Sequence, residues 1–152
     1  LFRSNTFRHH ASGVAIITLI DEAGKPVGFT ATSVTSLGAT PPLASFNVAS
    51  GSSTWPALCK ATWVAIHTLG EKNQQLATKM ANDHTKRFAN DDWTFGPKGL
   101  PIFPEATSVL IAGIREIHAV ENNAVVIVDV VDGLSGIEQR PLLYFQRNYL
   151  VG

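Results

Sequence analysis

Two clusters of hydroxyl side chains are the most chemically distinctive feature of the sequence. The first is the run GFTATSVTS that begins at Gly28, and the second is the run SGSST that ends at Thr54. The second cluster precedes a predicted short helix, with Thr54 as its N-cap and Pro56 in its first turn. Unpaired N–H groups at a helix start attract anions such as phosphate, and hydroxyl groups add uncharged donors. Ordinary caps and turns use the same residue types, so a phosphate site and a purely structural role both fit.

Other reactive residues do not form a pattern that indicates a metal site or a nucleophile. His9 and His10 are adjacent, while His67, His84 and His118 are scattered without cysteine or carboxylate partners at ligand spacing. No Gly-x-Ser-x-Gly run is present, so hydrolase chemistry finds no support. No Gly-x-Gly-x-x-Gly run opens a helix, so a bound dinucleotide would not use a Rossmann motif.

The single cysteine and the three tryptophans are predicted to have packing roles. Cys59 is expected to lie inside the short helix as a small apolar group. One cysteine forms no internal disulfide, which favours a reducing, cytoplasmic location. Trp55, Trp63 and Trp93 are expected in the core or at an interface, because large aromatic side chains dominate burial.

Length and composition describe one globular domain covering residues 1–152. Hydrophobic residues make up 45% of the chain and charged residues 16%, while 12 basic and 12 acidic side chains balance to zero. Nucleic-acid binding needs a basic face to displace counterions, and the composition does not supply one in bulk. The best apolar run, Ala124 to Val131, is interrupted by Asp129, so no membrane span is predicted. The chain opens at Leu1 without methionine, and an upstream segment is therefore expected to be missing.

The elements that position these residues are mainly strands, because the apolar runs are short, β-branched and bounded by turn residues. The predicted strands are Val14–Ile20, Val27–Thr32, Leu43–Val48, Trp63–Leu69, Val109–Val120, Ala124–Val131 and Leu142–Phe145. Helices are predicted at Phe2–His10, from Thr54 and at Glu71–Ala81, and Asn90–Pro104 is predicted as a long surface loop. The trio Glu121–Asn123 is a predicted turn in which asparagine takes a positive φ. These elements favour a closed or nearly closed antiparallel barrel.

Five motifs in order give the sequence a family resemblance over nearly its whole length. The stretch GFTATSVTSLGATPPLASFNVASGSST resembles the short-chain flavin reductase pattern, in which a Gly-x-Thr-Ala-Ser-Ser-type strand leads to a Pro-Pro-Leu strand and a Ser-Ser-Thr loop. FRHHASGVAII is similar to the family's opening helix and strand, and Glu71 to Phe88 to its Glu-Leu-Ala helix followed by Arg-Phe. PLLY at Pro141 and the later Tyr149 resemble its closing strand and terminal tyrosine.

The resemblance implies a mainly β, FMN-binding split barrel with a few short helices that dimerises and holds FMN or FAD at the subunit interface. The implied site residues are Thr30, Ala31, Thr32 and Ser33 at the isoalloxazine ring, Asn47 beside the flavin, Ser50, Ser52, Ser53 and Thr54 at the ribityl phosphate, and Arg87 and Phe88 closing the site. An arginine suits a phosphate because its planar fork bonds two oxygens. The implied reaction is hydride transfer from NAD(P)H to the flavin.

Three positions depart from the family pattern. Asn123 stands where the family commonly has the histidine of a Gly-Asp-His triplet, Phe145 replaces a second histidine, and Ser50 replaces a basic residue. Asparagine can donate a hydrogen bond but cannot exchange a proton near neutral pH. The leading hypothesis from the resemblance is an NAD(P)H:flavin oxidoreductase. Such an enzyme could serve as the reductase component of a two-component monooxygenase. The alternatives are a flavin carrier or sensor with little turnover, and a split-barrel domain that holds another ligand such as haem.

Overall fold

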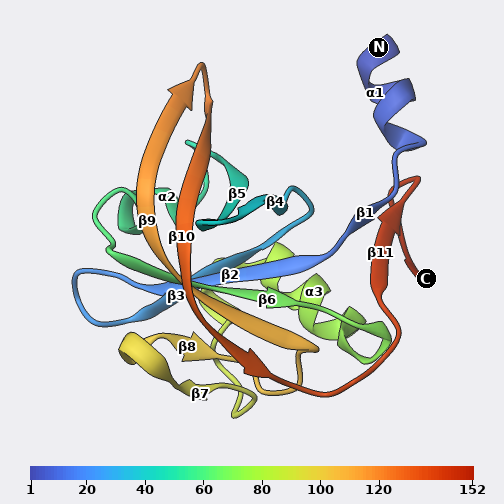
Figure 1. Ribbon diagram of the computed structural model, residues 1–152. Coiled ribbons are helices and arrows are strands. Elements are labelled where there is room, and N and C mark those ends of the chain that lie inside the picture. Colours follow the sequence, from blue (N-terminus) through green and yellow to red (C-terminus); the bar gives the residue numbers. More distant parts are fainter.

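A seven-stranded antiparallel sheet forms the body of the molecule in the computed structural model, which describes residues 1–152 (Figure 1). The strand order is β3-β2-β6-β9-β10-β5-β4. The strands span β2 Ala15–Ile20, β3 Pro26–Ala31, β4 Thr35–Ala39, β5 Pro42–Ala49, β6 Trp63–Thr68, β9 Ser108–Val120 and β10 Asn123–Ser135. The sheet curls so that β3 approaches β5, where the Asn47 N–H donates to the Ser33 hydroxyl at 2.9 Å. The result is a barrel that stays open between the two edge strands of the sheet, β3 and β4.

Two small sheets and three short helices surround this body (Figure 1). The minor strands are β1 Ser12–Gly13, β11 Leu142–Phe145 and β12 Asn148–Val151 in one sheet, and β7 Thr94–Phe95 with β8 Pro101–Ile102 in the other. The helices are α1 Phe2–Arg8, α2 Trp55–Leu58 and α3 Gln74–Ala81, with 3₁₀ turns at Glu71–Asn73, His84–Lys86 and Pro97–Gly99. Helix α1 extends away from the body and buries none of its residues. No helix has the length and apolar character needed to cross a membrane.

Two hydrophobic cores explain why β2 is apolar at almost every position. Ile17 and Leu19 face the barrel interior with Phe46, whereas Ile16 faces the opposite side and packs with Met80 of α3. A strand covered on both faces has no solvent side on which polar residues are favoured. Helix α3 therefore closes one face of the sheet and places its C-terminal end beside β3.

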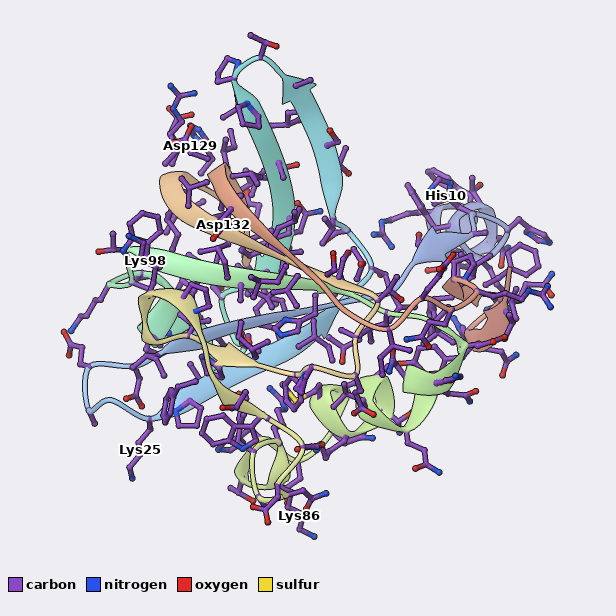
Figure 2. All side chains as sticks on the ribbon, turned by 60° about the horizontal axis from the view of Figure 1, so that its bottom comes forward. His10, Lys25, Lys86, Lys98, Asp129 and Asp132 are labelled. Carbon is purple, nitrogen blue, oxygen red and sulfur yellow. The ribbon has the colours of Figure 1, made fainter.

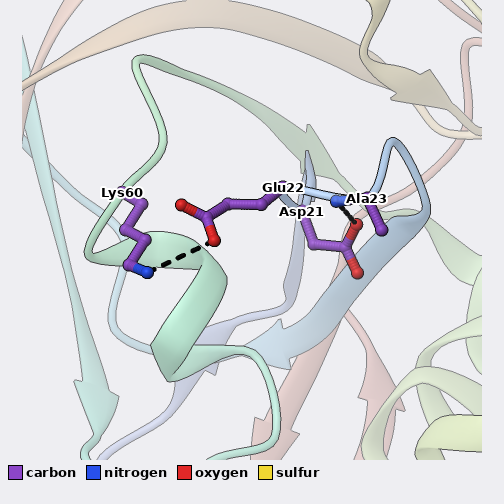
Figure 3. Close-up of polar contacts among 4 residues, drawn as sticks. All are labelled: Asp21, Glu22, Ala23 and Lys60. Atoms are coloured by element: carbon purple, nitrogen blue, oxygen red, sulfur yellow. Dashed lines mark hydrogen bonds and ion pairs between the residues drawn. The ribbon is translucent and has the colours of Figure 1, made fainter.

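The turn between β2 and β3 is fixed by side chains rather than by burial (Figure 3). One Asp21 carboxylate oxygen accepts from the N–H groups of Ala23 and Lys25, both at 2.9 Å. Lys60, just after α2, pairs with Glu22 at 3.2 Å, and both side chains are more than 60% exposed. Exposed pairs of this kind contribute about 0–1 kcal/mol. The main local constraints on the hairpin are therefore the Asp21 carboxylate and the backbone bonds from Asp21 to Lys25 and from Gly24 to Asp21.

Most predicted elements are confirmed, and four details are wrong. The segment Asn90–Pro104 is not a surface loop, because it contains β7 and β8 and buries Leu100 to Phe103. Cys59 is exposed, because α2 has only four residues and ends before it. Glu121, not an asparagine, has the positive φ of 52° in the β9–β10 turn. Strands β1, β4 and β12 were not predicted, since β1 has only two residues and the residues of β4 and β12 are largely exposed and lack an alternating pattern.

Candidate functional site

An open cavity of about 360 Å³ lies between β3, β5 and the C-terminal end of α3. Its lining residues are Phe29, Thr30, Ala31, Thr32, Ser33, Asn47, Val48, Ala49, Ser52, Met80, Ala81 and Arg87. The volume falls within the range of about 300–1,000 Å³ that is usual for small-molecule pockets. Seven of the eleven predicted site residues therefore meet in one concavity, although they come from four separate segments of the chain.

A smaller pocket of about 50 Å³ adjoins the cavity on the other side of Arg87. Its lining residues are Pro26, Val27, Gly28, Ser53, Thr54, His84, Arg87 and Phe88. Three more predicted site residues are found here. Because the Arg87 guanidinium lines both spaces, it stands at the boundary between them.

The edge of β3 supplies backbone groups to the larger cavity. The Gly28 carbonyl points away from β2, since it accepts from Arg87 Nη1 at 2.7 Å. Backbone groups on an antiparallel edge strand alternate in direction, so the Thr30 N–H also points outward. The Thr32 N–H has no partner within the chain. The Thr30 hydroxyl donates to the Ala77 carbonyl at 2.7 Å and so ties β3 to α3. The residues of this run therefore offer main-chain donors, while the Thr30 side chain is structural.

The second hydroxyl cluster differs from the sequence prediction in two respects. The N–H and hydroxyl of Ser50 both donate to the Asn122 carbonyl, at 2.9 and 3.0 Å, and Ser50 lines neither pocket. Thr54 occupies the N-cap of α2 but its hydroxyl donates to Gly28, at 3.4 Å, instead of capping the helix. The Gly51 and Ser53 N–H groups have no partner within the chain. The unpaired donors of this loop are therefore main-chain N–H groups around Ser53, because α2 has only four residues and its N-cap hydroxyl is engaged elsewhere.

Arg87 is the only ionisable residue that lines the larger cavity. Its Nε and Nη2 atoms donate to the Asn82 carbonyl at 3.1 and 2.7 Å, and Nη1 donates to Gly28. Burial lowers the Arg87 pKa, and the Asp83 carboxylate partly opposes this. A guanidinium has five N–H donors, so two remain for a ligand. The three backbone bonds hold the group rigidly, which reduces the entropy lost on binding an anion.

An aromatic cluster holds Phe88, the residue that follows Arg87. The Phe88 ring stacks on Phe103 with centroids 5.5 Å apart, and Trp93 Nε1 donates to the Phe88 carbonyl at 3.0 Å. Lys79 and Asp92 form an ion pair beside the same rings. Phe88 is therefore largely a packing residue whose edge reaches the small pocket.

Nine lining residues of the two pockets were not predicted as site residues, and three of them come from α3 and the turn after it. Met80 and Ala81 reach the large cavity from the end of α3, and His84 reaches the small pocket from the following turn. The sequence pattern of the predicted helix indicates that Met80 is buried. It does not indicate which strand the helix packs against.

All three positions that depart from the family pattern, Ser50 included, lie outside both cavities. Asn123 is exposed at the start of β10, opposite Val120 of β9 and Ala49 of β5. Phe145 is partly buried at the end of β11, opposite Asn148. Neither position lines the two pockets within one chain.

The curled antiparallel sheet, with a cavity along a free strand edge in which Arg87 is the only ionisable residue, defines the class of fold. Comparison with known proteins names the family. Residues 7–151 match the family described as flavin reductase like domain, and the chain belongs to that family. A flavin reductase domain protein from Arthrobacter sp. FB24 superimposes with a TM-score of 0.95 at 45% identity, covering 99% of this chain and 94% of that one.

Two named flavin reductases are also similar in sequence to this chain. An NADH:FMN oxidoreductase from Rhodococcus erythropolis is 37% identical over 147 residues, covering 93% of this chain and 76% of the relative. The reductase subunit HsaB of a flavin-dependent monooxygenase from Rhodococcus jostii is 32% identical over 139 residues, covering 91% of this chain and 70% of the relative. The predicted family and fold are confirmed.

Proposed function

We propose that this protein is an NAD(P)H:flavin oxidoreductase that binds FMN in the cavity between β3, β5 and α3. The observation that carries the proposal is the coincidence, in a flavin reductase-like chain, of a 360 Å³ cavity, unpartnered main-chain donors and a rigidly held arginine. A haem-binding alternative has no support in the relatives, which are flavin reductases.

The chemistry of the lining fits a flavin. The cavity has apolar side chains from Phe29, Ala49 and Ala81, each at least partly exposed, to contact a planar ring system. The β3 edge supplies main-chain N–H groups for ring oxygen and nitrogen atoms. Arg87 supplies the one positive charge, at the side where the cavity meets the small pocket. The pattern matches a ligand that is flat and uncharged at one end and anionic at the other.

A bound flavin would supply the hydride-accepting ring, so the protein contributes binding and orientation. Fixed N–H donors from Thr30 and Thr32 would stabilise negative charge that develops on the ring, without any residue having to titrate. The hydrogen bond from the Asn47 N–H to the Ser33 hydroxyl ties β5 to the segment that follows β3, at one side of the cavity. Positioning of the two reactants is then most of the protein's contribution to the rate.

The small pocket favours FMN over FAD as the bound flavin. Its volume of about 50 Å³ is a small fraction of the 360 Å³ of the adjoining cavity. A terminal phosphate group suits such a space, whereas an adenylate does not. Ser53, His84 and Arg87 surround it, and none of them is paired with a carboxylate.

A second copy of the chain is the proposed cover for the open side of the barrel. Strand β4 is exposed along its length, and Leu37 in it is 51% exposed. Val120 at the tip of the β9–β10 hairpin is 58% exposed. A homodimer buries such apolar edge residues and completes the flavin site between subunits. A partner monooxygenase that consumes the reduced flavin is proposed by analogy with the reductase subunit from Rhodococcus jostii.

The carrier or sensor hypothesis is the second candidate, and one observation favours it. Asn123 and Phe145 remove the two histidines that the family commonly has, and the cavity lining contains no group that titrates near neutral pH. The named activity of the oxidoreductase relatives favours turnover instead.

The experiment that separates the two combines FMN binding with NAD(P)H oxidation. Purified protein is titrated with FMN while flavin fluorescence is followed, and NADH or NADPH is then added and its absorbance recorded. Tight binding with oxidation well above the protein-free control supports the reductase. Tight binding with no oxidation supports a carrier, and absence of FMN binding rejects both.

A further inference from the structure

The two ends of the chain form a basic lobe that the flavin site does not use. Residues 1–20 and 139–152 contain four arginines and no lysine, aspartate or glutamate. The middle 118 residues contain eight basic and twelve acidic side chains, so the neutral total hides a strong asymmetry. Strands β1 and β11 pair, which brings both ends together beside α1. Figure 2 shows His10 on this lobe, with Asp129 and Asp132 well away from it.

A cleft of about 290 Å³ lies within the basic lobe, between α1 and the β11–β12 turn. Arg3, Arg8 and Arg147 line it, and the lining has no acidic residue. None of the three guanidinium groups forms an ion pair. Half of the chain's six arginines therefore converge, unneutralised, on one concavity.

A backbone hydrogen bond joins the two sides of the cleft. Gln146 donates its N–H to the Arg8 carbonyl at 3.0 Å, which fixes the end of α1 to the turn. Gln146 and Arg147 both have positive φ, at 51° and 62°. Such a two-residue hairpin turn is rigid because both central residues are confined to a small region of φ and ψ.

Aromatic side chains line the cleft beside the arginines. Phe7, His10 and Tyr144 belong to it, and Phe7 and His10 contact edge to face with centroids 6.1 Å apart. Arginine forks bind phosphate oxygens in pairs, and aromatic faces bind bases. The Arg3 guanidinium lies over the Phe7 ring, 5.0 Å from its centroid, so the arginines and aromatic rings already pack together. Aromatic rings beside three guanidinium groups that form no ion pair are the chemistry that recognises a phosphorylated nucleotide.

We propose that this cleft binds the phosphate-bearing nucleotide portion of the NAD(P)H co-substrate, an inference that rests on the proposed reductase function. It makes Arg3 and Arg147 co-substrate-binding residues that are separate from the flavin-binding cavity. A site with three arginines also favours the nucleotide with more phosphate, so NADPH binds more tightly than NADH.

The direct test measures binding of nucleotide fragments by calorimetry to the FMN-loaded protein. We expect 2′,5′-ADP to bind more tightly than 5′-AMP, and adenosine not to bind. Arg147→Gln and Arg3→Gln each weaken 2′,5′-ADP binding by about 10-fold, the usual scale for one charge-assisted contact. Arg115→Gln, which changes an exposed arginine on β9, serves as the matched control and leaves binding unchanged. Equal binding by wild type and the two cleft variants overturns the proposal.

Two further outcomes separate this proposal from the proposed function. In steady-state assays, Arg147→Gln raises the KM for NADPH by about 10-fold with kcat unchanged, because it removes binding that ground and transition states share. Normal NADPH oxidation with an unaltered KM in both variants overturns the cleft proposal and leaves the reductase intact. Binding of FMN or of a short oligonucleotide to the cleft more tightly than 2′,5′-ADP assigns it to another ligand and also overturns the proposal.

Discussion

His67 gives a quantitative prediction of how stability depends on pH. The ring is fully buried on β6 between two backbone partners. Its Nδ1 atom lies 3.2 Å from the Ile16 carbonyl, and Nε2 accepts from the Phe103 N–H at 3.0 Å. This pair of bonds requires the neutral tautomer with the proton on Nδ1, because a protonated ring has no acceptor for Phe103.

The size of the effect follows from the pKa of the folded state. Burial lowers the His67 pKa from 6.5 to about 4, and backbone hydrogen bonds oppose the change only in part. The unfolded chain therefore binds the proton first as the pH falls. The stability that His67 contributes is complete above about pH 6.5 and is lost between about pH 6.5 and 4. A change of about 2.5 pKa units corresponds to about 3 kcal/mol at 1.36 kcal/mol per unit.

Urea unfolding at two pH values tests this prediction. Wild type and His67→Gln are compared at pH 7 and pH 4.5, and the difference in unfolding free energy is taken at each pH, so that titrating carboxylates cancel. Glutamine keeps one donor and one acceptor but cannot be protonated. The advantage of wild type over the variant shrinks by about 2–3 kcal/mol at the lower pH. A difference that is the same at both pH values would refute the buried neutral histidine.

Three substitutions test the flavin site, the packing of β3 beside it and the position of one missing family histidine. Arg87→Gln weakens FMN binding by at least about 10-fold but riboflavin binding much less, because only FMN carries the phosphate; equal losses in fluorescence titrations would contradict the assignment. Gly28→Ala lowers the unfolding free energy by about 1–3 kcal/mol, since its Cβ would lie 2.5 Å from the Ile17 carbonyl oxygen; an unchanged Tm would argue against this packing. Restoring the family histidine with Asn123→His raises kcat for NADH oxidation, with FMN affinity as the control; an unchanged kcat removes that position from the reaction.

The sequence predicted site residues correctly where they belong to one continuous motif, and less well where tertiary contacts decide their partners. The motif around Thr30 placed the β3 edge correctly, because a Gly-Phe-Thr-Ala run between turn residues favours a strand. Ser50 shows the limit of that reasoning. Its hydroxyl looked identical to that of Ser52, and only the approach of the β9–β10 turn, more than 70 positions away in sequence, diverts it to Asn122.

The same limit explains the errors in the fold. Phe103 lies in a stretch broken by glycine and proline, which is typical of an exposed loop, yet the segment is buried because β6 presents His67 to its N–H. Met80 and His84 entered the site through tertiary packing of α3 and the turn after it. Local patterns predict elements, whereas pairing between distant elements decides which faces are covered.

Blocking the cavity tests the central claim most directly. Ala81 is exposed at the end of α3 and lines the cavity, so Ala81→Trp fills the space without disturbing either core. Ala23→Trp, on the exposed β2–β3 turn, is the matched control. We predict that Ala81→Trp abolishes both FMN binding and FMN-dependent NAD(P)H oxidation at an unchanged Tm, while Ala23→Trp keeps both. Wild-type FMN affinity in a folded Ala81→Trp protein would show that the flavin binds elsewhere.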